Sequence, residues 1–489
     1  MSAGTAPDYA EPPGLSRGKG IEAGLTLSLL VLVLVAALGA STVEPRLPGA
    51  GHLPPWTLLG ARPDPLGVVL LVIGALVLGG LCLARAVRAA AHDWQPRPSR
   101  LLAAGVLAVI ALSLVPATGS ADPESYAAYG RMVELGRDPY TTTPQELVAV
   151  GDPVAAAVED PWKDTPSVYG PLATAEQRFA SSIGNRSVRT TVVVLVLVNG
   201  VAFVLTGLLL VAMAGTEGAR RRAALLWMLN PLLLWELVSG AHVDGLVALF
   251  CVAGIAVASR SRLAAGLLLG CAAAIKLPAL AVLAGFLWAR RHSRRDVLAA
   301  IVGAAAVLAV GYATVSRHAL GRSLQAGQLA SWATPWRVGV SLLDATIGRP
   351  GSRTVMSLFA LVVALAFAVA LLRKESSTIE ADSATTRSAA TAGFCCYFAY
   401  LLAAPYALPW YDAPAWGLLV LMAPSAYDLL LTARTTALAA AYVTHDETHL
   451  PAHVHDAVVA MRNVVSPLVL TAVLVWAVAL VRRPSQPTR

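Results

Sequence analysis

A polar stretch from residue 121 to residue 171 places carboxylates beside aromatic rings, between two long apolar runs. Its first acidic residues are Asp122 and Glu124. Its aromatic residues are, in order, Tyr126, Tyr129, Tyr140, Trp162 and Tyr169. Carboxylates accept protons from sugar hydroxyls, and aromatic rings stack on sugar faces. The combination therefore predicts a saccharide site at a membrane surface.

Asp122 follows closely after the apolar run 101–117, so we expect it near the membrane surface. A carboxylate there can accept a proton from an acceptor hydroxyl within hydrogen-bond reach. Asp122-Pro123-Glu124 is also a good helix start, with Asp122 as the N-cap. Both interpretations are open at this point, and Glu124 is the rival base.

Two turn motifs carry further rings of this stretch, residues 136–140 and 168–171. Pro and Gly in both favour tight turns. Tyr126, Tyr140, Trp162 and Tyr169 are predicted to bind sugar. The alternative is that the same rings pack the segment onto the membrane interface.

Ionisable residues also lie close to apolar runs. Glu236, His242 and Asp244 fall in the junction 235–245, and Lys276 interrupts a long apolar segment. Such groups are costly in lipid and usually face a cavity or a charged partner. Glu236, His242 and Asp244 could contact phosphate, metal or sugar, and Asp244 is predicted to bind substrate. Lys276 is expected beside an anion, which is either a lipid phosphate or a carboxylate in the bundle. A polar cluster that only ties helix ends together is the alternative.

A second polar segment, 316–353, contains Arg322 and Arg337, which suit phosphate contacts through their planar guanidinium groups. Solvated loop charges are the alternative. Trp410 and Tyr411 lie at a Pro-rich helix break and are predicted to line a substrate groove, or else to form an aromatic belt.

Signals for metals and nucleotides are weak. The histidines His445, His449, His453 and His455 resemble a metal cluster by count, but Pro451 interrupts them and no Cys pattern accompanies them. The five cysteines lie in apolar runs without CxxC spacing, as expected of buried hydrophobes. No P-loop or Rossmann motif is present. We therefore predict no metal ligands, and only leave a divalent cation open as a cofactor.

The scaffold for these residues is predicted to be an all-α polytopic membrane bundle. The chain has 489 residues, of which 56% are hydrophobic and 13% charged, about half the charge of a soluble domain. Apolar runs long enough to span a bilayer recur along it. Thirteen or fourteen spans are expected, near 23–41, 66–86, 101–117, 189–213, 223–239, 243–259, 263–275, 277–290, 297–315, 354–372, 390–408, 411–425, 427–444 and 464–482.

The Lys and Arg residues gather in short segments between these runs, which the positive-inside rule explains better than nucleic-acid binding does. Both termini are then cytoplasmic, with tails at 1–20 and 483–489 flanking one membrane domain, 21–482. The segments 118–188, expected to be partly helical, and 316–353 fall outside. Two basic clusters flank 263–288, so we expect a hairpin of two short helices that meet near Lys276 and Pro278.

Several motifs together resemble a known family, although each alone is weak. They are Asp122 with Ser125-Tyr126 and Tyr129-Gly130, Gly136 with Asp138-Pro139-Tyr140, Trp162 through Pro171, Asn230-Pro231, Gly240-Ala241-His242 with Asp244, Ile275-Lys276 and Leu408-Pro409-Trp410-Tyr411. In this order they resemble the GT-C glycosyltransferases, and among them the actinobacterial polyprenol-phosphate-mannose-dependent α-1,6-mannosyltransferases, the MptA/MptB group. The resemblance covers residues 100–430. Val243, between His242 and Asp244, departs from the more polar residue expected there.

The resemblance implies a plasma-membrane enzyme with an extracytoplasmic active site. It would transfer mannose from a polyprenyl-phosphate donor to a lipid-linked glycan in α-1,6 linkage, with inversion. Asp122 would be the base, and Lys276, His242, Arg322 and Arg337 would stabilise the leaving phosphate.

Other functions remain as alternatives. A transferase for arabinose or another polyprenyl-phosphate sugar is one. A lipid or solute transporter is another, favoured only by Lys276 beside Pro278, because transporters carry ionisable residues at mid-membrane on broken helices. A receptor or structural membrane protein would leave the carboxylates and rings of 121–171 unexplained.

Overall fold

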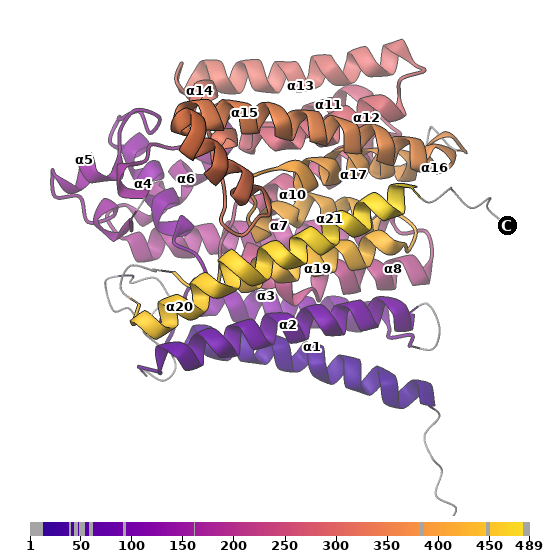
Figure 1. Ribbon diagram of the computed structural model, residues 1–489, viewed down its shortest axis with the longest axis horizontal. Coiled ribbons are helices and arrows are strands. Elements are labelled where there is room, and N and C mark those ends of the chain that lie inside the picture. The colour runs from indigo at the N-terminus through magenta and orange to yellow at the C-terminus, as the bar shows by residue number, and fades with distance from the viewer. Residues whose placement is uncertain are drawn as a thin grey trace, which may run out of the picture.

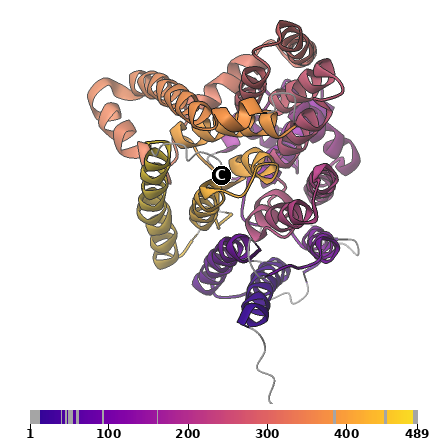
Figure 2. The same cartoon turned by 90° about the vertical axis from the view of Figure 1, so that its right-hand side faces the viewer.

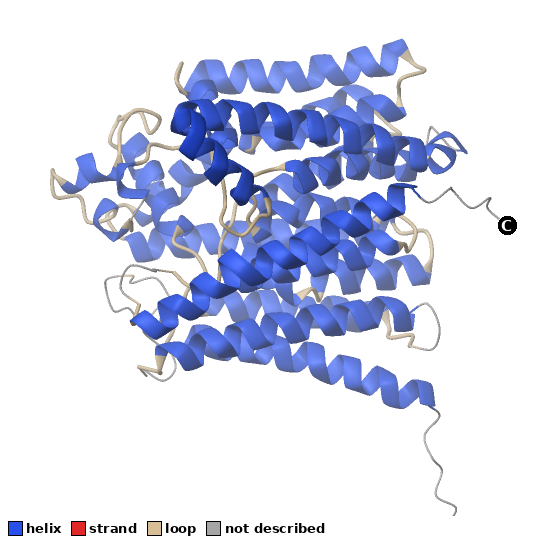
Figure 3. Cartoon of the chain, viewed as in Figure 1, coloured by secondary structure: helices blue, strands red, loops and turns tan. Residues whose placement is uncertain are grey.

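The computed structural model describes residues 13–38, 41–43, 47, 54–57, 62–90, 94–160, 162–381, 386–445 and 450–482. These residues form helices joined by turns and contain no strand, as Figure 3 shows. The prediction of an all-α polytopic protein is confirmed. The helix α1 begins at Pro13, inside the segment for which a tail was expected. The other tail, 483–489, and His449 lie outside the described residues.

The long helices are α1 (Pro13–Ala37), α2 (Pro65–Ala90), α3 (Pro98–Leu114), α7 (Val188–Met213), α13 (Arg294–Val315), α15 (Trp336–Lys374), α17 (Thr386–Ala403), α19 (Ala426–Ala441) and α21 (Ser466–Arg482). Shorter helices of the bundle are α8 (Glu217–Ala223), α9 (Pro231–Leu233), α10 (Asp244–Val257), α11 (Arg262–Ile275), α12 (Leu280–Ala289), α16 (Ser376–Ala381), α18 (Ala413–Val420) and α20 (Ala452–Ala460). The polar segments form α4 (Asp122–Glu134), α5 (Pro144–Val148), α6 (Pro171–Gly184) and α14 (Ala319–Gln325). Short 3₁₀ or π turns are η1 (Ala155–Ala157), η2 (Trp162–Asp164), η3 (Ala224–Met228), η4 (Leu234–Ser239), η5 (Leu277–Ala279), η6 (Ala326–Gln328), η7 (Pro409–Asp412) and η8 (Met461–Val465).

Six described helices are long and apolar enough to cross a membrane, or seven if one bent pair is counted as a span. That pair, Glu217–Ser239 and Asp244–Val257, bends by 118°. Each of the fourteen expected segments coincides with a helix or a run of short helices. Fewer helices meet the criterion of length and apolar composition than the number of spans predicted, because several of the segments are short or are broken by Pro and polar residues.

One such break lies within the segment 217–239. Pro231 lacks a backbone N–H, and the Asn230 side chain caps the new helix by accepting a bond from Leu232 N at 3.1 Å. The π turns η3 and η4 flank this break. Their bulky residues Trp227 and Trp235 are fully buried, so the irregular backbone lies inside the bundle.

The chain reverses at Lys276, as the hairpin prediction requires. Gly266 of α11 faces Ala300 of α13, and Gly270 faces Ala304, so these two helices run in the same direction. The helix α12, which joins them, must therefore run back. Because neither glycine has a side chain, the two backbones can approach closely.

The polar helices and the basic residues occupy opposite ends of the bundle. In Figure 1, α4, α5 and α6 lie together at the left, whereas α8, α16 and the end of α21 lie at the right. The basic residues of α8 and those that end α15 and α21 lie in the right-hand group. Figure 2 views the molecule from this end, with most helices seen along their axes. The separation agrees with the predicted topology, in which 118–188 and the basic clusters face opposite sides.

Candidate active site

The turn that follows α3 holds the start of α4 against the η4 segment. Thr118 N donates to Ser239 O at 3.1 Å, and the two hydroxyl oxygens of these residues lie 2.6 Å apart. Gly119 has a φ of +82°, and a Cβ there would come within 2.7 Å of the Trp235 indole nitrogen. Only glycine suits this conformation and this close approach. The turn therefore brings Asp122 next to the junction 240–244.

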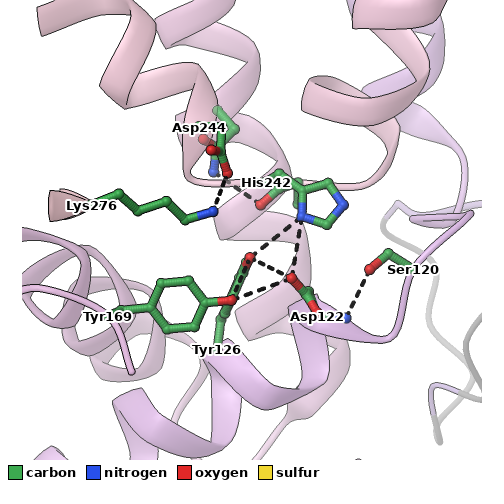
Figure 4. Close-up of polar contacts among 9 residues, drawn as sticks. Ser120, Asp122, Tyr126, Tyr169, His242, Asp244 and Lys276 are labelled. Carbon is green, nitrogen blue, oxygen red and sulfur yellow. Dashed lines mark hydrogen bonds and ion pairs between the residues drawn. The ribbon is translucent and has the colours of Figure 1, made fainter. Parts of the chain in front are cut away.

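Asp122 is the centre of a hydrogen-bonded cluster, shown in Figure 4. Its Oδ2 accepts from the Tyr126 hydroxyl at 2.9 Å and from the Tyr169 hydroxyl at 3.3 Å. The Nδ1 atom of His242 lies 3.5 Å from the same oxygen.

The expectation that Asp122 caps α4 is wrong, because Ala121 holds the N-cap position and Asp122 is the first residue of the helix.

The charge on Asp122 is favoured by its neighbours. Burial alone would raise its pKa, but the hydrogen bond and charge of His242, then Lys276 and Tyr126, hold the pKa of this carboxyl below its ordinary value. Asp122 lies on α4, outside the helices that can span the membrane. It is therefore ionised and able to accept a proton near neutral pH.

His242 supports Asp122 from behind. Its side chain is fully buried, and its ring stacks on Trp410 with centroids 3.5 Å apart and an interplanar angle of 11°. Ala241, just before it, has a φ of +50°, and Asn199 Nδ2 donates to the Ala241 carbonyl at 3.3 Å. Asn199 also donates to Glu176 Oε1 at 2.8 Å. This network fixes the plane of the imidazole ring beside Asp122.

Lys276 occupies the reversal between α11 and η5. Its Nζ lies 2.6 Å from Asp244 Oδ2, and it sits 4.3 Å from the centre of the Tyr411 ring. The Tyr169 ring is 5.6 Å from the same ammonium group. Gly170 holds this reversal, the Lys276 tip, in place, because its N–H donates to Ile275 O at 3.0 Å. A cation is thus held beside aromatic rings and close to the Asp122 cluster.

A cavity of about 540 Å³ opens beside these residues. Asp122, Asp244 and Lys276 are the charged residues among its described lining. One apolar side of it is formed by Leu329, which follows η6, and by Ala360, Leu361 and Ala364 of α15. Leu361 is 56% exposed, so this part of the wall reaches the surface of the bundle. The size suits a sugar together with the start of a lipid chain.

Five more predicted residues lie at the cavity or immediately behind it. Trp162, Tyr169 and Tyr411 line it. Tyr126 and Trp410 do not, because the first is fully buried behind Asp122 and the second packs on His242. Tyr126 and Trp410 therefore position the residues in front of them.

Three further predicted residues lie elsewhere. The Tyr140 hydroxyl pairs with Thr174 Oγ1 at 2.6 Å in the interior of the loop. Arg322 Nε donates to the Tyr140 carbonyl at 2.9 Å, and the Arg337 guanidinium stacks 3.8 Å from the Trp332 ring. None of the three lines the cavity. Arg322 thus links the segment 316–353 to Tyr140, whereas Arg337 contacts a ring of its own segment.

Glu124 faces away from Asp122. Its Oε1 lies 3.3 Å from His445 Nε2, and the other ring nitrogen lies 3.2 Å from Glu159 Oε1. Burial alone would lower the pKa of His445, but the two carboxylates raise it to about 10. Among the described residues no cluster of His, Cys, Asp and Glu could hold a metal ion. The structure thus gives His445 carboxylate partners.

Some cavity residues were not predicted. Tyr397 and Tyr400 line it, as do Ser125 and Ser323. Tyr397 and Tyr400 lie within an apolar run, where an aromatic residue is unremarkable in sequence. Their spacing of three residues on α17, which places both on one helical face, was the available signal.

Comparison with known proteins identifies the family. A family model described as alpha-(1->6)-mannopyranosyltransferase, N-terminal domain, matches residues 22–292. Alpha-(1->6)-mannopyranosyltransferase A of Mycobacterium tuberculosis is 32% identical over 275 residues, which are 54% of this chain and 51% of that protein. The enzyme of the same name from Corynebacterium glutamicum is 28% identical over 183 residues, 37% of this chain and 36% of that protein.

A second Corynebacterium glutamicum protein, alpha-(1->6)-mannopyranosyltransferase B, is 29% identical over 140 residues, 28% of this chain and 23% of that protein. The alignments span about half of the first of these relatives and less of the other two. No solved structure matches the chain. The family match includes Asp122, Tyr169, His242, Asp244 and Lys276 and covers more than half of the chain. The chain therefore belongs to the alpha-(1->6)-mannopyranosyltransferase family defined by this N-terminal domain.

Proposed function

We propose that the protein is a membrane mannosyltransferase that moves mannose from a polyprenyl-phosphate donor to a lipid-linked glycan on the outer face, in α-1,6 linkage and with inversion. The observation that carries the proposal is the position of Asp122 and Lys276 on one cavity. An ionised carboxylate and a cation there match the two charges that this reaction requires. Membership of the family supports the sugar and the linkage.

In the proposed reaction Asp122 takes the proton of the acceptor hydroxyl as its oxygen attacks the anomeric carbon of mannose. The bond between that carbon and the phosphate oxygen breaks at the same time. The leaving group departs as a polyprenyl phosphate monoester with one additional negative charge. Attack from the opposite face inverts the configuration at the anomeric carbon.

Lys276 is the residue best placed to stabilise the leaving phosphate. The electrostatic stabilisation that a preorganised cation provides is larger where water is excluded. The aromatic rings of Tyr169 and Tyr411 shield the Lys276 ammonium group from water. Asp244 holds the ammonium group at 2.6 Å before substrate arrives. His242, for which the sequence predicts phosphate binding, contacts Asp122, and we assign it to positioning this carboxylate.

The apolar wall provides a place for the lipid. Leu324, Leu329 and Leu361 border the cavity and are all partly exposed. An isoprenoid chain bound against η6 and α15 would leave its phosphate near the polar end. This arrangement favours a lipid-linked donor over a nucleotide sugar, which would require a polar binding surface for its base and ribose.

The test is a comparison of donors with membranes that contain the full chain. Labelled mannosyl phosphopolyprenol, arabinosyl phosphopolyprenol and nucleotide-activated mannose are supplied in parallel, and label in glycolipid is measured. The proposal predicts transfer from the mannosyl phosphopolyprenol, with an α-1,6 bond in the product. Transfer from the arabinosyl donor alone would reassign the sugar, and transfer from the nucleotide sugar alone would overturn the lipid-linked donor.

A further inference from the structure

A second cavity, of about 980 Å³, lies at the end of the bundle opposite to the candidate active site. The ends of α7 and α8 form one side, and the turn between α18 and α19 forms another. Residues of α16 and the start of α17 complete the lining. This is the end at which the basic residues gather, and the proposed reaction does not use it.

Three arginines line this cavity, Arg221, Arg222 and Arg387, and no carboxylate is among its described lining residues. Arg221 and Arg222 are more than nine-tenths buried. Asp428, behind the wall, pairs with Arg222 Nη1 at 3.0 Å and offsets one charge. The cavity therefore retains a positive charge that a bound anion would neutralise.

The three arginines differ in what they can offer a ligand. Arg222 donates from both Nη atoms to Asp428 and to the Leu419 carbonyl, and its Nε is buried away from the cavity, so Arg222 supplies no free donor. Arg221 uses Nε to donate to Pro96 O at 3.0 Å, which fixes its guanidinium at the wall. Arg387 is exposed at the rim. An anion between Arg221 and Arg387 would therefore meet two guanidinium groups whose charge no described carboxylate of the lining offsets.

The rest of the lining is largely apolar. Leu210, Leu225, Leu226, Val420 and Met422 form much of it, and all five are buried. Exposed Thr216 and Thr378 stand at the rim with Arg387. An apolar floor with arginines fits an amphiphile that carries a phosphate better than it fits a free anion. The cavity is also at the upper end of the volumes usual for ligand sites.

We propose that this end cavity binds one anionic phospholipid from the adjacent leaflet, with Arg221 and Arg387 as ligands of its phosphate group. Basic pockets between membrane helices at the cytoplasmic side are known to hold anionic lipid headgroups. Arginine suits the role because its planar fork donates two parallel bonds to phosphate oxygens. The acyl chains would lie over the apolar floor. This inference does not depend on the proposed transfer reaction.

The test uses the purified full chain, freed of lipid in detergent. Phosphatidylglycerol or phosphatidylcholine with identical acyl chains is added, and the thermal unfolding midpoint is followed as a function of lipid. A ligand that binds the folded state raises this midpoint in proportion to its occupancy. We expect phosphatidylglycerol to raise the midpoint at concentrations at which phosphatidylcholine has little effect.

The variant Arg387→Gln removes one exposed ligand and is expected to weaken binding of phosphatidylglycerol about tenfold, since a charged hydrogen bond contributes that much. Arg373→Gln is the matched control, because Arg373 is also exposed at this end but does not line the cavity. Arg221→Gln provides a second, buried ligand variant.

Three results would overturn the proposal. Equal effects of the two lipids would show that charge is not recognised. An equal loss in Arg373→Gln would show a diffuse electrostatic effect. An equal rise with inorganic phosphate alone would reassign the cavity to a free anion.

Discussion

Asp122 and Tyr126 lie four residues apart on α4, so their side chains share a face of that helix. Tyr169 and His242 reach the same carboxylate from segments distant in the sequence. Three contacts on one oxygen restrict the carboxylate to a single orientation. A base held in this way loses little entropy when the acceptor hydroxyl arrives.

The pH dependence of transfer tests the contact between His242 and Asp122. Because the pKa of Asp122 is lowered, we expect wild-type activity to fall only below the ordinary aspartate pKa of 3.8. His242→Phe keeps a ring on Trp410 but removes the Nδ1 contact, so the pKa of Asp122 rises and the acid limb moves to higher pH. The rate as a function of pH is measured for both proteins. A uniform loss of rate without movement of the limb would contradict this role.

At the residue scale, the sequence predicted those site residues whose chemistry is unusual for their surroundings. Asp122, Asp244 and Lys276 are costly next to apolar runs, and all three line the cavity. Glu124 could not be separated from Asp122 by chemistry alone. Two residues rotate a helix by about 200°, so only the orientation of α4 shows which carboxylate faces the cavity.

At the element scale, close helix contacts set the position of the site. The α6 segment begins at Pro171, directly after Gly170, whose N–H binds the last turn of α11. A Cβ at Gly170 would lie 2.3 Å from the Ala274 carbonyl oxygen. Both groups are backbone, so neither can move aside without displacing its helix.

Gly170→Ala should therefore separate α6 from the Lys276 tip. Its φ of −78° suits alanine, so the effect is steric and not conformational. We expect a loss of about 1–3 kcal/mol of stability, as for other overpacked sites, together with reduced transfer. Unfolding and transfer are compared with those of Gly321→Ala, where a Cβ would meet nothing within 4 Å. Equal behaviour of the two variants would show that this contact does not position the tip.

The ion pairs of His445 with Glu124 and Glu159 join the segment after α19 to α4. The pKa of His445 is raised, so the contribution of these pairs to stability is complete below about pH 6.5, the ordinary pKa of histidine. This contribution is lost as the pH rises towards 10. His445→Gln should therefore lower the unfolding midpoint most near pH 6, by an amount that corresponds to about 3 kcal/mol, and less as the pH rises. Thermal unfolding between pH 6 and pH 10 measures this, with the exposed His292→Gln as control. A difference that does not change with pH would contradict the charged pairing.

Element positions were largely predictable because apolar length and Pro breaks are local signals. The hairpin at Lys276 followed from the basic residues on both sides of it, and the parallel pairing of α11 with α13 bears it out. The sequence alone could not show whether Arg322, Arg337 and Tyr140 face the cavity. Whether a loop residue faces a cavity or another loop depends on tertiary contacts.

At the scale of the whole molecule, the chain separates two environments. The acidic and aromatic loop lies at one end, with basic residues and the larger cavity at the other. The positive-inside rule predicts that the basic end faces the cytoplasm. The donor and acceptor of the proposed reaction would then meet outside the cell.

This orientation is tested by labelling introduced cysteines in intact cells. Val150 is 64% exposed on the loop, and Glu217 begins α8 at the opposite end. An impermeant maleimide should label Val150→Cys in intact cells but Glu217→Cys only after permeabilisation. The native cysteines are buried or half-buried, and the unmodified protein serves as the background control. The reverse pattern would place the candidate site in the cytoplasm.

The most direct test of the account is the rate of mannosyl transfer by Asp122→Asn and Glu124→Gln, compared with wild type at matched amounts of folded protein. The account predicts that Asp122→Asn loses about 10²–10⁴-fold in rate, the usual contribution of a general base, while Glu124→Gln retains transfer. Full activity in Asp122→Asn, or a loss confined to Glu124→Gln, would contradict the assignment of Asp122 as the base.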